Sequence, residues 1–254
     1  MAKAGLFGKG ADAGYPLCEQ ALRVDPNNVR ALIVLAGKFW MPVNMGTSAD
    51  PRADTNRADE LLSQALALDP TVAWAHNSKA WNLRGQGRIE EAVAERERAL
   101  VLDPGDMGTL QSLAWDHVWL GHFDKGLELF DKAIRLSPRD PALQFMYFGK
   151  SRTYFGLKQY DQAIDRARRA ITIGPNNPFP HAILAAALAL TGHEAEAREA
   201  LQDYLALPSS AQIRTIAALK AYEARFTNVN ADPRALETSQ REHDGLRKAG
   251  MPEE

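Results

Sequence analysis

Apolar residues recur three and four positions apart along most of the chain, which is the spacing of one face of an α-helix. Several of these helical segments end in a proline, in the phrases QALRVDP, QALALDP, RALVLDP, KAIRLSP and RAITIGP, with a weaker match in YLALP. The prolines are Pro26, Pro70, Pro104, Pro138, Pro175 and Pro208, at intervals of 44, 34, 34, 37 and 33 residues. The pattern predicts an all-α chain with a 34-residue repeat that contains one insertion of ten residues (44 − 34) and one of three (37 − 34).

Small residues occupy the same columns of each repeat, where two helices must approach closely. With the proline as position 32, position 27 is Ala21, Ala65, Ala99, Ala133 and Ala170, and position 20 is Ala58, Ala92, Gly126, Ala163 and Ala197. Position 8 is Ala36, Ala80, Ala114, Ser151 and Ala185, and the turn between the two helices has Gly87, Gly121 and Gly192. The period and these columns resemble the tetratricopeptide repeat (TPR) over residues 29–208. The resemblance implies a right-handed superhelical solenoid of about five helix-turn-helix repeats.

The same resemblance implies which residues face a ligand. In this family the first helix of each repeat lines a concave groove, and five positions of that helix point into it. At those positions the sequence has Trp40, Trp74, Asn77, Trp81, Arg84, Trp115, Trp119, Phe145, Phe148, Arg152, Phe155 and Phe179. Tryptophan combines a large apolar area with one N–H donor and often anchors protein interfaces. We therefore expect the groove to bind a protein or peptide, with Arg84 and Arg152 pairing with carboxylates.

Two other interpretations fit these aromatic residues. Aromatic stripes on helices usually belong to a core, so the rings would pack between neighbouring repeats. Alternatively, the chain's own C-terminal tail or its insertion loop would cover the groove. Repetition alone leaves all three interpretations open.

The chain divides into three parts around the repeats. Residues 1–28 form an incomplete half repeat, which suggests a fragment of a longer protein or a frayed start, and residues 29–208 form the solenoid. The ten-residue insertion predicts a loop at about 41–56, because Pro42, Gly46 and Pro51 oppose a continuous helix there. The three-residue insertion predicts an additional helical turn with Asp140 as N-cap and Pro141 as the first helical residue. In residues 209–254 we expect a helical cap or tail, with one helix from Ser210 to about Phe226 and another from Pro233 to Lys248, N-capped by Asp232 and ended by Gly250.

Composition and charge narrow the function classes. With 30 basic and 32 acidic residues the net charge is −2, which argues against non-specific nucleic-acid binding. The longest apolar run, residues 182–190, is too short to cross a bilayer, and the N-terminus lacks a signal-peptide pattern, so we expect a cytoplasmic protein without membrane insertion. A single cysteine, Cys18, excludes an internal disulfide framework and a cysteine-based zinc site.

One segment, WDHVWLGHFD, contains four residues that could bind a metal: Asp116, His117, His122 and Asp124. Their positions in the repeat place one histidine at a packing site and the other in a turn, so the ring nitrogens need not converge. The sequence has no glycine-rich phosphate loop, nucleophile elbow or HExxH motif. We therefore expect no metal, no cofactor and no enzymatic activity, and an autonomous enzyme stays a remote alternative.

A narrower resemblance covers residues from about 27 to 254. The phrases RADELLSQALALDP, KAIRLSPRDPALQFMYFGKSRTYFGLKQYDQAI and DGLRKAGMPEE are similar to the C-terminal repeat region of rhizobial-type class III adenylate cyclases. In that family the catalytic domain precedes the repeats, and its paired metal-binding aspartates have no counterpart in this sequence. The resemblance implies a regulatory or self-associating repeat region as the alternative to a scaffold that binds a separate partner.

Overall fold

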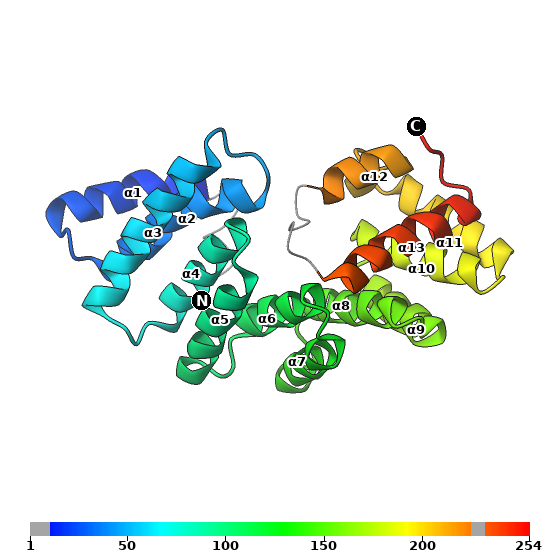
Figure 1. The fold of residues 1–254 in the computed structure, drawn as a ribbon, viewed down its shortest axis with the longest axis horizontal. Coiled ribbons are helices and arrows are strands. Elements are labelled where there is room, and N and C mark those ends of the chain that lie inside the picture. Colours follow the sequence, from blue (N-terminus) through cyan, green and yellow to red (C-terminus); the bar gives the residue numbers. More distant parts are fainter. Residues whose placement is uncertain (1–10, 225–231) are drawn as a thin grey trace. The chain divides into compact units, whose positions relative to one another are not determined.

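The computed structural model describes residues 11–224 and 232–254, and within them every regular element is a helix (Figure 1). The α-helices are α1 (Ala11–Val24), α2 (Val29–Asn44), α3 (Pro51–Leu68), α4 (Ala73–Gly85), α5 (Ile89–Leu102), α6 (Met107–Trp119), α7 (Phe123–Leu136), α8 (Leu143–Gly156), α9 (Tyr160–Ile173), α10 (Pro178–Leu190), α11 (Glu194–Ala206), α12 (Ile216–Glu223) and α13 (Pro233–Ala249). A short 3₁₀ helix, η1 (Pro208–Ser210), follows α11. The all-α prediction is confirmed.

The chain forms two compact units, residues 1–109 and residues 110–254. In the first unit α2 packs against α3 and α4 against α5, while α1 packs on α2. In the second unit α8 packs against α9 and α10 against α11, and α13 packs mainly on α10. Each unit has its own apolar core: Leu32, Ile33 and Leu62 are fully buried in the first, and Ile183 and Tyr204 in the second.

Small residues stand at the helix crossings as the repeat predicts. Ala58, Ala92, Ala163 and Ala197 at position 20 are fully buried, as are Ala36, Ala80, Ala114 and Ala185 at position 8. At Gly126 an added Cβ would lie 2.7 Å from Val118 Cγ2, so α6 and α7 meet too closely there for a larger residue. The turn glycines Gly87, Gly121 and Gly192 all have positive φ, at 79°, 72° and 86°. The equivalent residue between α8 and α9 is Lys158, which takes the same left-handed conformation at φ 60° without being a glycine.

Two histidines at position 4 of their repeats, His76 and His181, bond to the preceding repeat. His76 Nε2 lies 2.9 Å from the carbonyl of Pro70, and His181 Nε2 lies 3.1 Å from that of Pro175, so each ring bridges back to the proline that ends the preceding repeat. The other ring nitrogen of His76 lies 2.7 Å from Glu95 Oε2. Burial opposes ionisation of Glu95, but the hydrogen bond to His76 and the charges of Lys79 and Arg98 outweigh burial and lower its pKa.

Part of the region around the ten-residue insertion is helical, although the sequence predicts a loop there. The loop predicted at about 41–56 comprises only residues 45–50, because α2 continues through Pro42 to Asn44 and α3 starts at Pro51. The Pro42 carbonyl accepts hydrogen bonds from the amides of Thr47 and Ser48, which close the end of α2, and Asp50 caps α3 by accepting from Ala53 N. The extra residues therefore lengthen both helices, to 16 and 18 residues against 13 in α4.

Two further boundaries differ from the predictions. Asp140 and Pro141 form a turn before α8 rather than its first turn: Asp140 Oδ1 accepts from Ala142 N at 2.8 Å, and the helix begins at Leu143. The helix predicted from Ser210 begins only at Ile216, because the hydroxyl of Tyr204 donates to the carbonyl of Ile213 and Thr215 caps the helix. Phe226, its predicted end, lies outside the described residues. Helix α13 agrees with its prediction, with Asp232 as N-cap and Gly250 at φ 107°.

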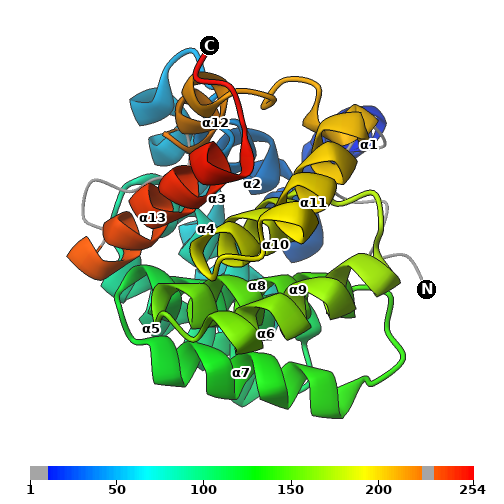
Figure 2. The same ribbon diagram turned by 90° about the vertical axis from the view of Figure 1, so that its right-hand side faces the viewer.

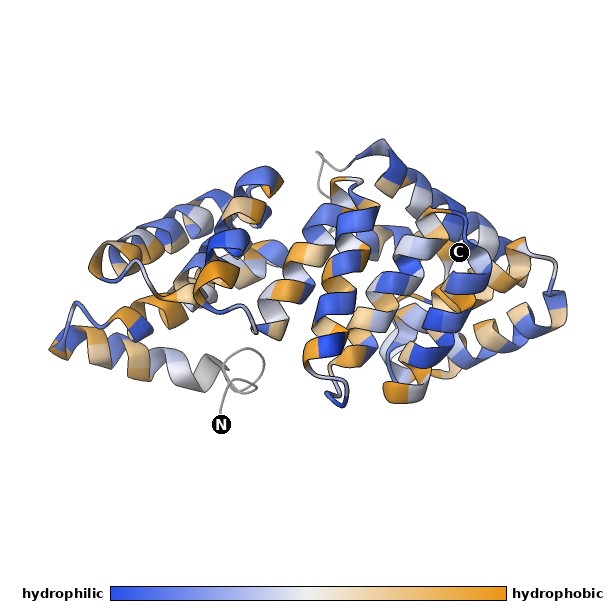
Figure 3. Ribbon diagram, turned by 90° about the horizontal axis from the view of Figure 1, so that it is seen from below, coloured by the Kyte–Doolittle hydropathy of each residue, from blue (hydrophilic) through white to orange (hydrophobic). Residues whose placement is uncertain are grey.

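Apolar and polar residues alternate along the helices, as expected for elements with one face in a core and one in water (Figure 3). Among the described residues no helix combines the length and the apolar character needed to cross a membrane.

Candidate binding faces

The first unit presents one stripe of predicted groove residues along α4. Trp74, Asn77, Trp81 and Arg84, here called the α4 stripe, are spaced three, four and three residues apart and therefore share one helix face. All four are partly exposed. The stripe thus combines two indole rings, one amide and one guanidinium on a surface that solvent reaches. The Oδ1 atom of Asn77 is buried and has no hydrogen-bond partner among the described residues.

A stack of aromatic and cationic groups holds the middle of this stripe. The ring of Trp81 lies parallel to that of Trp40 on α2, with centroids 5.7 Å apart and planes inclined by 8°. The guanidinium of Arg96 lies 4.8 Å from the Trp81 ring, and that of Arg84 lies 5.9 Å from it. The side chain of Asn44 donates to the backbone carbonyl of Trp81 at 2.9 Å. Trp40 is buried in this stack, whereas Trp74 and Arg84, at the two ends of the stripe, are partly exposed.

The second unit builds its predicted groove aromatics into a ladder. Ring centroids are 5.4 Å apart between Trp115 and Phe148, and 5.8 Å apart between Phe148 and Phe179. The ladder ends on Tyr222 of α12, whose ring lies 5.8 Å from that of Phe179. These rings stack from helix to helix through α6, α8, α10 and α12. In the second unit the aromatic residues therefore provide packing between repeats.

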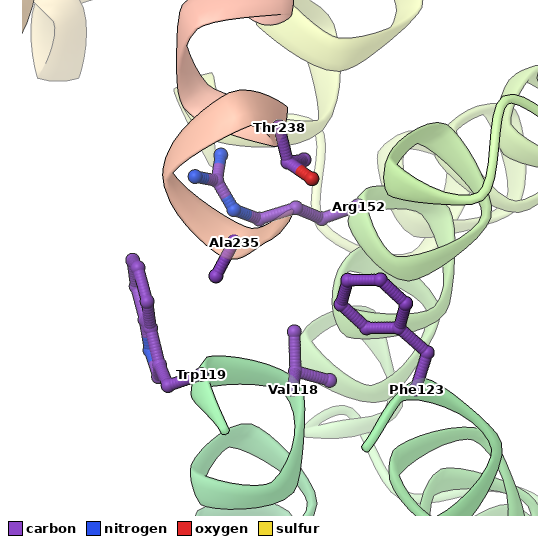
Figure 4. Close-up of a pocket in the computed structure, with 6 residues that line it drawn as sticks. All are labelled: Val118, Trp119, Phe123, Arg152, Ala235 and Thr238. Atoms are coloured by element: carbon purple, nitrogen blue, oxygen red, sulfur yellow. The ribbon is translucent and has the colours of Figure 1, made fainter. Parts of the chain in front are cut away.

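The α8 stripe, Phe145, Phe148, Arg152 and Phe155, repeats the spacing of the α4 stripe in different surroundings. Phe145 is 41% exposed, whereas Phe155 is fully buried in the core. Arg152 forms an ion pair with Glu242 of α13 and donates to the hydroxyl of Ser239 at 2.7 Å. Its guanidinium also lies 5.8 Å from the ring of Trp119 (Figure 4).

Helix α13 covers the face to which the α8 stripe belongs. It lies alongside α10 and also contacts α8 and α11 (Figures 1 and 2). Gly245 faces Ala186 of α10, which stands one 34-residue repeat after Arg152, so closely that an added Cβ would lie 2.7 Å from the Ala186 carbonyl oxygen. At the other end of the helix Asp232 N donates to the carbonyl of Trp119 at 2.9 Å. The chain's own tail therefore lies on the predicted groove of the second unit.

The contact between α13 and α8 contains buried charge. The pKa of Glu242 is raised to about 7, chiefly because burial disfavours its charged form; the charge of Arg152 opposes this rise and that of Glu223 adds to it. The neighbouring His243 pairs through Nε2 with Glu223 at 2.9 Å. Its Nδ1 is buried and has no hydrogen-bond partner among the described residues.

The predicted groove residues thus have three different environments. Trp74, Asn77, Trp81 and Arg84 lie together on one accessible face of the first unit. Trp115, Phe148 and Phe179 stack between repeats, and Phe155 is a core residue, which corrects its assignment to an accessible groove. Trp119 and Arg152 lie against α13. The repeat register could not identify Glu242, Ser239 and Gly245 as their partners, because α13 lies outside the periodic part of the chain.

The two histidines of the WDHVWLGHFD segment lie close together. The Nδ1 atoms of His117 and His122 are 3.4 Å apart, although their positions in the repeat do not require the rings to converge. Asp116 and His117 are both buried. Among the described residues no third histidine, cysteine or carboxylate joins such a group to form a set that could hold a metal ion.

Comparisons with known proteins agree with the repeat geometry. Residues 112–178 match the family model of the tetratricopeptide repeat. The chain has the tetratricopeptide-repeat fold. A curated relative, Hsp70-Hsp90 organizing protein 3 of Arabidopsis thaliana, is 27% identical over 124 residues, which make up 49% of this chain and 22% of that protein. The matching TPR region thus spans about a fifth of the relative's length.

Solved structures support the same fold across both units. A chain of Pseudomonas aeruginosa pilF has a TM-score of 0.58 at 17% identity, and the match covers 85% of this chain and 98% of that one. A chain of the human IFIT1 dimer with m7Gppp-AAAA has a TM-score of 0.65 at 20% identity, with 98% of this chain and 56% of that chain covered. At these identities the likeness establishes the architecture alone.

Proposed function

We propose that this TPR protein is a non-catalytic scaffold that binds a segment of a partner protein on the α4 stripe. The observation that carries the proposal is the grouping of Trp74, Asn77, Trp81 and Arg84 on one partly exposed helix face. The stack with Trp40 holds Trp81 in place, so a ligand would lose little side-chain entropy by ordering it. Trp74 offers apolar area to be covered, and Arg84 offers donors for a carboxylate.

Chaperone proteins are the partner class to test first. The relative with 27% identity is named as an organizing protein of Hsp70 and Hsp90, although the match spans only 22% of its length. The regulatory role in an adenylate-cyclase-like protein finds no support in the comparisons. Cytoplasmic localisation and self-association rest on the sequence expectations alone.

Affinity capture with variants of the α4 stripe tests this proposal. Full-length chain carrying Trp74→Ala and Arg84→Ala should retain about tenfold less of a partner than the unmodified chain, because both accessible ends of the stripe are removed. Purified Hsp70 and Hsp90 serve as defined probes beside a cell extract, and cross-linked peptides are mapped by mass spectrometry.

The matched control is Val101→Ala, since Val101 lies on α5 of the same unit and is 80% exposed. Far-UV circular dichroism checks that all variants keep their helices. Equal capture by the stripe variant and the control, or cross-links that fall only on outer helices, would exclude the α4 stripe as the binding face.

A further inference from the structure

The second unit shows what kind of ligand its inner face accepts. Helix α13 contacts Arg152 of α8, a predicted groove residue, and Ala186 of α10, which stands one 34-residue repeat later. Ala182, Ala186 and Ala189 of α10 stand 34 residues after Phe148, Arg152 and Phe155, and all three are nearly or fully buried. Small side chains let a second helix approach closely, and at Gly245 the approach leaves no room for a Cβ beside Ala186. The surface therefore fits a helix that has a glycine opposite Ala186.

Polar contacts fix the direction and register of α13 on this face. Near its middle, Glu242 and Ser239 bind the guanidinium of Arg152. Arg241 donates to the carbonyls of Phe155 and Gly156 in the last turn of α8, at 3.3 and 3.1 Å. Figure 4 shows the Arg152 guanidinium directed toward α13, beside Ala235 and Thr238. These contacts require a helix with a carboxylate three residues before the glycine that faces Ala186.

Several features weaken the docking of α13 compared with an apolar contact of the same size. The ion pair between Arg152 and Glu242 is buried, with side chains 11% and 4% exposed, and desolvation of such pairs offsets much of their attraction. Glu223 places a second carboxylate near Glu242, and the Nδ1 atom of His243 is buried without a partner among the described residues. A helix without the second carboxylate and without the unpartnered imidazole nitrogen could compete with α13 for the same face.

Resting on the proposed function as a partner-binding scaffold, we propose that α13 is an intramolecular ligand that occupies the inner face of α8 and α10 until an acidic amphipathic helix of a partner displaces it. The partner helix pairs a carboxylate with Arg152 and places a glycine against Ala186. Displacement also breaks two hydrogen bonds that the C-terminal residues accept: Pro252 O from Ile216 N and Glu253 O from Ala217 N. Release of α13 therefore loosens the start of α12 as well.

The chain's own tail supplies the probe for a binding experiment. A fluorescein-labelled peptide of residues 232–254 is titrated against full-length chain and followed by fluorescence anisotropy. Unmodified chain should bind it weakly, since the tethered α13 competes at high effective concentration. Gly245→Ala in the full-length chain should tighten peptide binding by about tenfold, because the added methyl forces α13 away from Ala186. Gly14→Ala is the matched control, since an added Cβ at Gly14 meets no atom within 4 Å.

A charge exchange tests the register of the contact. In the Gly245→Ala background, Arg152→Glu should abolish binding of the natural peptide, and a peptide with Glu242→Arg should restore it. Equal, weak binding to Gly245→Ala, Gly14→Ala and unmodified chain would overturn the proposal, as would charge-independent binding.

Hydrogen exchange of the unmodified chain gives a result even if Gly245→Ala fails to fold. If α13 is displaceable, its amides should exchange faster than those of α10. The free energy of the opening that exposes them should be lower than the free energy of global unfolding. Equal protection of the two helices would mean that α13 is a fixed part of the core, and would overturn the proposal. Because the probe is the chain's own tail and its site is in the second unit, failure here leaves the proposal for the α4 stripe intact.

Discussion

The α4 stripe and the α8 stripe have the same spacing but different environments. On α4, Trp74, Asn77, Trp81 and Arg84 all keep partial exposure. On α8 the corresponding residues range from Phe145, which is 41% exposed, to Phe155, which is fully buried, and the arginine between them pairs with α13. Both stripes lie on the helix face that the repeat register specifies. Whether that face is covered depends on the helices of neighbouring repeats and, in the second unit, on α13.

The difference shows how one repeat position can serve binding in one unit and stability in another. A side chain contributes to ligand affinity only if its surface is accessible in the free protein, and to stability only if it is already buried. The last residue of each stripe illustrates this, since Arg84 is partly exposed while Phe155 lies in the core. Variants at equivalent positions should therefore separate the two roles.

The largest effect is expected within the α8 stripe itself. Phe155→Ala should lower the free energy of unfolding by about 4 kcal/mol, since it leaves a large cavity in a fully buried site. Phe145→Ala should cost less than about 1 kcal/mol because its ring is already partly in water. Guanidinium chloride unfolding followed by circular dichroism measures both. Similar losses for the two variants would mean that burial does not distinguish the ends of the stripe.

The second comparison concerns the two arginines. Arg152→Ala should cost about 3 kcal/mol near pH 8, because Glu242 loses its cation and must then either stay charged in a buried site or take up a proton. Arg84→Ala should cost about 1 kcal/mol or less, since it removes a partly exposed cation over the Trp81 ring. The double variant Arg152→Ala with Glu242→Gln should regain part of the loss. If it is no more stable than Arg152→Ala alone, the cost does not come from the unpaired carboxylate.

The fold was largely predictable from the sequence because it depends on local, repeated constraints. Small residues at positions 8 and 20 mark helix crossings, and the glycines at the turns have the positive φ that their position requires. Helix ends next to the insertions were less predictable. Pro42 was expected to end α2, but the helix ends two residues later. The amides of Thr47 and Ser48 donate hydrogen bonds to the carbonyl of Pro42.

The repeat register predicted which helix face carries the candidate residues, but it did not predict which of them are accessible. The register placed the α4 stripe on one face, but it could not reveal that Trp115 and Phe148 would stack on each other or that Phe155 would be enclosed. These outcomes depend on neighbouring repeats and on α13, whose contacts with Arg152 span 87 and 90 residues of sequence. No periodic signal connects residues so far apart.

A third test uses the pH dependence of stability to probe the buried contact between Glu242 and Arg152. The folded-state pKa of Glu242, about 7, lies above its ordinary value of 4.5 because the carboxyl is buried. The folded state therefore holds a proton that the unfolded state releases between about pH 4.5 and 7, so the contribution of Glu242 to stability falls as pH rises through that window. The slope is at most about 1.4 kcal/mol per pH unit.

Glu242→Gln should remove this pH dependence, since the amide does not titrate. The quantity to measure is the difference in unfolding free energy between the unmodified chain and Glu242→Gln at several pH values between about 5 and 8. The unmodified chain should lose stability relative to the variant as pH rises to about 7. A difference that stays constant with pH would show that Glu242 titrates normally in the folded protein.

The smallest effect is expected at the turns that follow the two stripes. Gly87 ends the turn after α4 with φ 79°, while Lys158 adopts φ 60° in the equivalent turn after α8. A left-handed conformation costs a residue with a side chain about 1 to 2 kcal/mol, and glycine avoids that cost but loses more conformational freedom on folding. Lys158→Gly should therefore raise the free energy of unfolding by about 0.5 kcal/mol. The reverse exchange, Gly87→Lys, should lower it by a similar or larger amount, and thermal unfolding of the two variants measures both signs. If Lys158→Gly destabilises the chain instead, the Lys158 side chain contributes more to the turn after α8 than its backbone strain costs.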